Sequence, residues 1–221
     1  MHHRIPPGAA IAGLLMLITL PGRAAVIDFA GLSAPGNDFA FLGTTVAQGG
    51  FVFESTPSLY GGELGVWQDD SPNHPAGGVA GTSLVEYYAY AVTTMTPADG
   101  QPFRLDAIDL APWRAGQYGS FDVTFVGTKR DGSTVAQTVT VRNANGAVPV
   151  LQHFPFSGFI DLASVAFVQG ESPSSYTAYQ FNRVDVSRAP VPEPGTVWLF
   201  SLGIVGGVAS RLRRRFGRAS R

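Results

Sequence analysis

Short runs in which apolar and polar residues alternate recur through the middle of the chain, and no segment there keeps a helical period. Phe121, Val123 and Phe125 would face one side of a strand, with Asp122 and Thr124 on the other. Such alternation suits a strand that buries one face and leaves the other in water. We expect strands near residues 25–29, 50–55, 84–92, 103–110, 121–126, 134–142, 148–156, 164–168 and 179–186. Many short strands at this spacing predict an all-β fold, a single jelly-roll-like β-sandwich.

Turn sequences separate some of these runs. Asp131-Gly132 follows the fifth predicted strand and Asn145-Gly146 follows the sixth. Both dipeptides favour the positive φ angles of tight turns, so we expect two hairpins. The longest loop-like stretch covers residues 68–82, where Asp, Asn, Pro and Gly gather.

The last thirty residues combine an apolar stretch with an arginine-rich end. Residues 196–212 hold one charged side chain, Arg211, and as a helix they would span about 26 Å, against about 30 Å for the hydrocarbon core of a bilayer. Arginine side chains that reach to the interface cover part of this deficit. We predict a transmembrane helix over 196–212 and a cytoplasmic tail over 213–221, because positive charge favours the inside. The arginines that would stop transfer are Arg211, Arg213, Arg214 and Arg215.

A Pro-Glu-Pro triplet stands in front of this apolar stretch, inside a predicted linker over residues 188–195. Pro192 and Pro194 keep the residues before them extended, so Glu193 would lie on a stiff strand just outside the membrane. An enzyme embedded in the bilayer can read such a strand. The alternative is an ordinary single-pass anchor that holds a periplasmic domain.

The order Val-Pro-Glu-Pro-Gly-Thr, short apolar helix and arginine-rich end resembles the PEP-CTERM sorting signal of Gram-negative bacteria, over roughly residues 190–221. The resemblance implies that an exosortase-type enzyme processes the chain near Pro192, Glu193, Pro194 and Gly195. It also implies delivery to the cell surface or the extracellular matrix, often beside exopolysaccharide genes. The same segment is sometimes labelled an ice-binding-protein C-terminal motif, a label that carries no statement about ice binding.

The other end of the chain has the pattern of a signal peptide. Residues 9–20 are apolar and too short to span a membrane, and Arg4 precedes them. Gly22-Arg23-Ala24 fits the rule of small residues around a cleavage site, so we predict a signal peptide over residues 1–24. The exported β-sandwich domain would then cover residues 25–187.

The charge of the exported part restricts its partners. Residues 26–192 hold seven Lys and Arg side chains and fifteen Asp and Glu side chains, a net charge of −8. An acidic domain of this kind argues against nucleic-acid binding, which requires a basic face. The chain has no cysteine, which excludes thiol catalysis and zinc sites with cysteine ligands.

Parts of the middle of the chain resemble the exported domains that usually precede this sorting signal, at Gly50–Phe53, Phe103–Leu110 and Gln180–Val186. Those domains are similar to carbohydrate-binding β-sandwiches, which implies a structural, adhesive or polysaccharide-binding role. Sugar binding requires exposed aromatic rings with polar groups at the rim. The ligand-binding candidates are Trp67, Trp113, Asp69 and Asp70, and the further aromatic pool is Tyr60, Tyr87, Tyr88, Tyr90 and Tyr118.

Catalytic chemistry is the alternative to binding. His74 lies near Asp69, Asp70 and Ser71, which allows a hydrolytic triad to be imagined, but the chain has no Gly-x-Ser-x-Gly elbow. A carboxylate pair for glycoside hydrolysis is available among Glu54, Glu63, Asp69, Asp70 and Glu86. Since most of these acids are expected at the surface, and His153 inside a strand, we predict no catalytic residue and keep a hydrolase of low specificity as the alternative.

A structural calcium ion is the one cofactor that the sequence suggests. Asp28 falls in the first predicted strand, and Asn182 and Asp185 fall in the last, where β-sandwiches often bind calcium. Asp69-Asp70 with Asn73 is a second oxygen-rich group. Neither group has the spacing of a calcium loop, so solvent-facing acids remain the simpler interpretation.

Overall fold

Strands make up most of the chain that the computed structural model describes. The described residues are 23–32, 35–36, 38–76, 83–114, 119–142, 148–170 and 179–188. They contain thirteen strands and one short 3-10 turn, η1 (Ala30–Leu32), and they fall within the compact unit Gly22–Ala189. The all-β prediction is confirmed.

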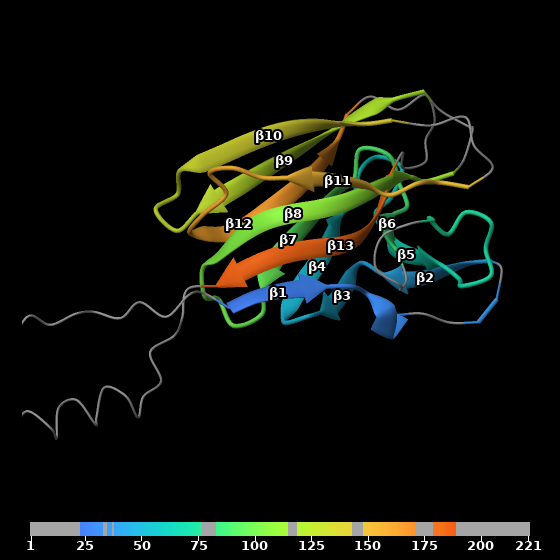
Figure 1. Cartoon of the computed structure of the whole chain (residues 1–221), viewed down its shortest axis with the longest axis horizontal. Coiled ribbons are helices and arrows are strands. Elements are labelled where there is room, and N and C mark those ends of the chain that lie inside the picture. The colour runs from blue at the N-terminus through green and yellow to red at the C-terminus, as the bar shows by residue number, and fades with distance from the viewer. Residues whose placement is uncertain are drawn as a thin grey trace, which may run out of the picture. The chain divides into compact units, whose positions relative to one another are not determined.

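The strands pair into two antiparallel layers, and Figure 1 shows β1, β13 and β8 in front of β3, β4 and β7. The first layer runs β2-β5-β6-β13-β8-β11, with β1 also paired to β13. Its strands are β1 (Arg23–Ile27), β2 (Phe39–Gly43), β5 (Leu64–Trp67), β6 (Leu84–Glu86), β8 (Phe103–Pro112), β11 (Gln152–Pro155) and β13 (Tyr179–Arg188).

The second layer runs β3-β4-β7-β12-β9-β10. Its strands are β3 (Thr45–Gln48), β4 (Phe51–Thr56), β7 (Val92–Pro97), β9 (Phe121–Lys129), β10 (Thr134–Val141) and β12 (Leu162–Gln169). One backbone pair, Leu162 opposite Phe103, connects the first residue of β12 to the first residue of β8 and so joins the two layers.

Aromatic rings from both layers form the core between the sheets. The Phe181 ring of β13 lies 5.4 Å from that of Phe29 and 5.2 Å from that of Phe167 in β12, between ring centroids. Phe53 of β4 closes the cluster at 5.9 Å. The first two contacts are edge to face, a geometry that is favourable beyond the area that it buries. With no disulfide in the chain, this core provides most of the stability.

The predicted strand over residues 84–92 is wrong, because the chain turns inside it. Leu84–Glu86 is β6 in the first layer, and Val92–Pro97 is β7 in the second. Between them Ala91 N donates to Tyr88 O, and Tyr90 has a φ of 62°. A positive φ cannot continue an extended strand. Three further strands, β2, β3 and β5, were not predicted at all.

The Asp131-Gly132 hairpin is confirmed. β9 and β10 pair antiparallel up to Thr134 opposite Thr128, and Gly132 has a φ of 84°. The Asp131 carboxylate accepts hydrogen bonds from the hydroxyl and backbone N of Ser133, at 2.7 and 2.9 Å, and these bonds lower the pKa of Asp131.

The second predicted hairpin is wrong. β11 pairs with β8, where Phe154 lies opposite Ile108, and β10 pairs with β9. Asn145 and Gly146 lie outside the described residues. The side chain of Gln152 instead bonds to the backbone N and O of Arg142, at 3.0 and 2.7 Å.

The predicted sorting segments fall outside the described residues. Residues 1–22 and 189–221 contain most of the predicted signal peptide, the Pro-Glu-Pro motif, the apolar stretch and the arginine tail. Across the described ranges, the structure contains no helix with the length and hydropathy needed to cross a membrane. β1 begins at Arg23, so cleavage after Ala24 would leave Ala25–Ile27 of this strand.

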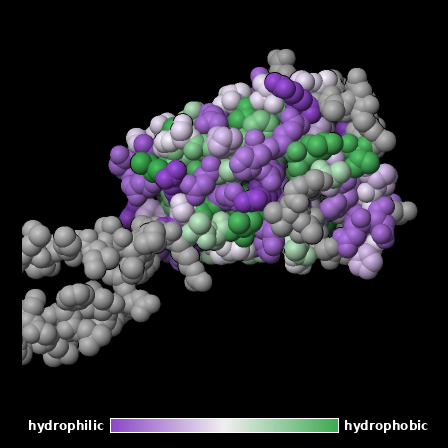
Figure 2. Space-filling model, viewed as in Figure 1, coloured by the Kyte–Doolittle hydropathy of each residue, from purple (hydrophilic) through white to green (hydrophobic). Residues whose placement is uncertain are grey.

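We call the compact unit Gly22–Ala189 the β-domain. Its surface mixes polar and apolar residues, with a hydrophobic stretch at the right-hand end of the view in Figure 2. Several large apolar side chains are exposed. They belong to Val26, Phe41, Leu59, Tyr60, Tyr90, Val148, Val150, Ile160 and Val168.

A candidate aromatic binding face

Aromatic side chains cover the outward side of the β2-β5-β6 sheet. In β5, Leu64 and Val66 belong to the core, while Gly65 and Trp67 alternate to the other side. The neighbouring strand β2 directs Phe39 and Phe41 to the same side. We define the aromatic face by its rings, which are those of Phe39, Phe41, Trp67, Tyr87 and Trp113.

The rings of the aromatic face form a continuous series. Phe41 and Tyr87 have centroids 4.9 Å apart, Phe39 and Trp67 5.0 Å, and Trp67 and Trp113 5.7 Å. The first two of these pairs meet edge to face, a preferred geometry for aromatic rings. Each ring therefore holds its neighbour in position.

Gly65 allows the Phe39 ring to lie close over the backbone of β5. A Cβ atom at this position would lie 2.2 Å from Cζ of Phe39 and 2.8 Å from the backbone O of Ala40. Such contacts are far too short, so any larger residue would displace the ring. The missing side chain at position 65 is part of how the aromatic face is built.

Exposure varies along the aromatic face. Trp67 and Trp113, the ring candidates that the sequence suggested, are 4 % and 2 % exposed. Phe41 is 51 % exposed, and Phe39 and Tyr87 are half-buried. The two tryptophans therefore form the base of the face, and Phe41, Phe39 and Tyr87 are the rings that a ligand can reach.

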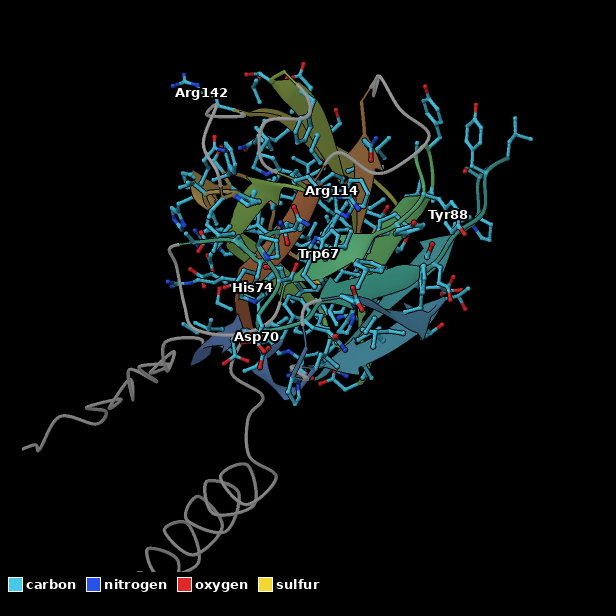
Figure 3. All side chains as sticks on the ribbon, turned by 90° about the vertical axis from the view of Figure 1, so that its right-hand side faces the viewer. Trp67, Asp70, His74, Tyr88, Arg114 and Arg142 are labelled. Atoms are coloured by element: carbon cyan, nitrogen blue, oxygen red, sulfur yellow. The ribbon has the colours of Figure 1, made fainter. Side chains whose placement is uncertain are left out.

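Arg114 places a cation on the buried end of the aromatic face. Its guanidinium carbon lies 4.3 Å from the ring centroid of Trp113 and 5.4 Å from that of Trp67. Figure 3 shows Arg114 and Trp67 at the same end of the β-domain, with His74 and Asp70 below them. Arginine over a tryptophan face is the strongest common cation–π pair.

A buried glutamine attaches the loop after β5 to this region. Nε2 of Gln180 donates to the carbonyl oxygens of Asn73 and Pro112, both at 2.9 Å, and lies 3.4 Å from that of Trp113. The loop that contains Asp69, Asp70 and His74 therefore lies beside the end of β8. Asp70 is exposed, and its backbone N donates to Gly36 O.

The geometry of this loop gives no organised triad. The Ser71 hydroxyl is buried and accepts a hydrogen bond from Asn73 N at 3.2 Å. Within the described part of the chain, no hydrogen bond involves the His74 imidazole. The carboxylates grouped for glycoside hydrolysis lie in different surroundings, since Glu54 on β4 is exposed and Glu86 on β6 is buried.

The predicted calcium ligands have other contacts. Asp185 accepts two hydrogen bonds from the Arg183 guanidinium, at 2.6 and 2.8 Å. The Asp28 carboxylate accepts from Ala30 N at 3.3 Å, and Asn182 is buried. Among the described residues, no group of three His, Asp or Glu side chains could hold a metal ion.

One histidine–carboxylate hydrogen bond on the first layer was not predicted from the sequence. Nδ1 of His153 in β11 lies 2.7 Å from Oδ1 of Asp109 in β8, and these residues are opposite each other in the strand pairing. Asp109 is buried, whereas His153 is largely exposed. The imidazole therefore acts as the hydrogen-bond partner of a buried carboxylate, consistent with the expectation that His153 lies in the sheet.

Glu86 fixes the turn that carries Tyr87. Its carboxylate accepts hydrogen bonds from the backbone N of Glu63 and Tyr88, at 3.3 and 3.4 Å. Burial raises the pKa of Glu86, and hydrogen bonds to the carboxylate offset part of this effect. A raised pKa in the folded state means that the stabilising contribution of Glu86 is complete below its unfolded pKa and is lost as the pH rises through its folded pKa.

We therefore expect Glu86→Gln to raise the Tm at pH 7 by about 2 °C or more. The gain should disappear below about pH 4, because both side chains are then neutral. Thermal unfolding followed by circular dichroism from pH 3.5 to 8 measures the difference. Glu54→Gln, a change at an exposed carboxylate, is the matched control. An equal gain at pH 3.5 and pH 7 would contradict the prediction.

Residues 190–215 match a family model that describes a sorting signal. This segment is a PEP-CTERM protein-sorting motif. The PEP-CTERM motif implies export and processing of the C-terminal segment by an exosortase-type enzyme. It includes the predicted processing residues Pro192, Glu193, Pro194 and Gly195.

Comparison with curated proteins finds no match. Among solved structures, the β-domain is similar to CBM29_1, a family 29 carbohydrate binding module from Piromyces equi. The sequence identity is 13 % and the TM-score is 0.38, and the match covers 68 % of this chain and 90 % of that chain. It is also similar to the CBM22-1 xylan-binding domain from Paenibacillus barcinonensis, with 11 % identity, coverage of 78 % and 98 %, and a TM-score of 0.35.

Proposed function

We propose that this protein is exported, processed at its PEP-CTERM motif and retained at the cell surface or in the extracellular matrix, where its aromatic face binds polysaccharide. The protein is a substrate of the exosortase-type enzyme. The observation that supports binding is a series of aromatic rings on the outward side of a sheet, where an ordinary sandwich has polar residues.

The chemistry of the aromatic face suits a sugar chain. Sugar rings have apolar faces formed by C–H groups and polar edges formed by hydroxyls. Phe41 and Tyr87 can contact the apolar faces, and the Arg114 guanidinium can bond to the hydroxyls. The rings are already fixed by their neighbours, so binding costs little side-chain entropy.

We expect Phe41→Ala to weaken polysaccharide binding by about threefold to tenfold, the effect of losing about 1 kcal/mol of ring contact. Affinity electrophoresis of the full chain in detergent, through gels that contain xylan, galactan, glucan or polygalacturonate, measures the change. Tyr60→Ala is the matched control, because the Tyr60 ring is 54 % exposed and pairs with Tyr90 outside the aromatic face. An equal loss in both variants would place the binding site elsewhere, and no retardation by any polymer would refute the proposed function.

A further inference from the structure

Arg114 carries a charge that no acidic group of the described residues neutralises. The guanidinium makes no hydrogen bond or ion pair within the described ranges, and its Nε is buried. The arginines that do form ion pairs there are Arg104, Arg183 and Arg188. Arg114 is half-buried, and partly removing a cation from water without an anion beside it costs free energy. A site that holds such a cation is suited to bind an anion from outside the protein.

The packing of Arg114 prepares it for such an anion. Trp113 and Trp67 contact the guanidinium at 4.3 and 5.4 Å and restrict where it can move. The N–H groups of a guanidinium lie in the plane of the guanidinium itself. When the guanidinium lies over an aromatic ring, these groups can still form a fork that fits the two oxygens of a carboxylate. Less side-chain entropy is then lost when the anion binds.

We propose that the aromatic face binds a polysaccharide that carries carboxylate groups, and that Arg114 pairs with one of these carboxylates. This inference rests on the proposed function, because the rings of Phe41 and Tyr87 would hold the sugar chain that presents the acid. The domain as a whole is acidic, but at 0.15 M salt charges separated by more than about 8 Å are largely screened. Acidic side chains farther away than this distance therefore weaken the attraction of the guanidinium only slightly.

Polygalacturonate and its fully methyl-esterified form provide a matched pair of probes, since they share a backbone and differ in charge. We expect the full chain to bind polygalacturonate about tenfold more tightly than the ester, the effect of one charge-assisted hydrogen-bonded pair. Arg114→Gln should abolish this preference, and Arg114→Lys should keep only part of it. Affinity electrophoresis in detergent at 0.15 M NaCl measures all of these values.

Arg142→Gln is the matched control, because it makes the same change in net charge at an exposed arginine whose backbone, rather than side chain, bonds to Gln152. An equal loss in Arg142→Gln and Arg114→Gln would overturn the inference, as would binding to dextran sulfate as tight as to polygalacturonate. Equal binding to the acid and the ester, lost in Phe41→Ala, would overturn the inference and leave the proposed function intact. Binding to no polymer would overturn both.

Discussion

Alanine in place of Glu193 is expected to block processing completely and to leave the protein at full tail length in the membrane. Glu193 is the only charged residue in the Pro-Glu-Pro segment, and from the sequence we expect Pro194 to favour an extended backbone at Glu193. An enzyme that recognises this segment within the bilayer interface loses its one ionic contact in the variant. The wild-type chain should lack the residues beyond the motif and should be found outside the cell.

Intact mass and cell fractionation of the protein from its native host test this expectation. Glu54→Ala, which removes an exposed carboxylate of the β-domain, should be processed like the wild type. A Glu193→Ala chain that is cleaved and released would contradict the assigned role of Glu193. A wild-type chain that keeps its tail in the inner membrane would reduce the segment to a simple anchor.

Alanine in place of Phe181 is expected to destabilise the β-domain by about 3–5 kcal/mol, the usual cost of removing a buried phenylalanine ring. Phe181 contacts rings from both layers, so its loss leaves a cavity that neither sheet can close alone. The Tm should fall by about 10 °C. Urea unfolding of the full chain in detergent, followed by tryptophan fluorescence, measures the free energy of unfolding.

Phe41→Ala is the control for Phe181→Ala because it removes the same ring from an exposed position. It should cost less than about 1 kcal/mol of stability. A similar loss in both variants would mean that the aromatic face contributes as much to stability as the core, which would weaken the argument that its rings serve a ligand.

Local patterns in the sequence identified strands where one face is buried and the other is in water. In β9, Phe121 and Val123 are buried while Asp122 is exposed, as alternation predicted. In β5 the alternation of buried and exposed residues is lost. Leu64 and Val66 are buried in the core, and Trp67 is buried among the other rings of the aromatic face. A strand that is buried on both sides shows no alternation.

The sites depend on contacts between distant segments, which alternation does not encode. Trp67 and Trp113 were named as candidates, but Phe39 and Arg114 join them only through the pairing of β2 with β5 and the end of β8. The turn over residues 87–91 falls inside the strand that alternation predicts over residues 84–92. A hydrogen bond of 2.7 Å from the Ser58 hydroxyl to Ala89 O instead ties it to a neighbouring turn.

The position of β13 has a consequence for export. β13 is the last strand of the described residues, yet it lies inside the first layer, between β8 on one side and β6 and β1 on the other. This layer cannot close until residue 188 is available, because its central strand is synthesised after all of its neighbours. Pairings so distant along the chain form slowly. For a chain that crosses the membrane with its N-terminus first, the first layer can complete its pairing on the far side only after the segment next to the sorting motif has emerged.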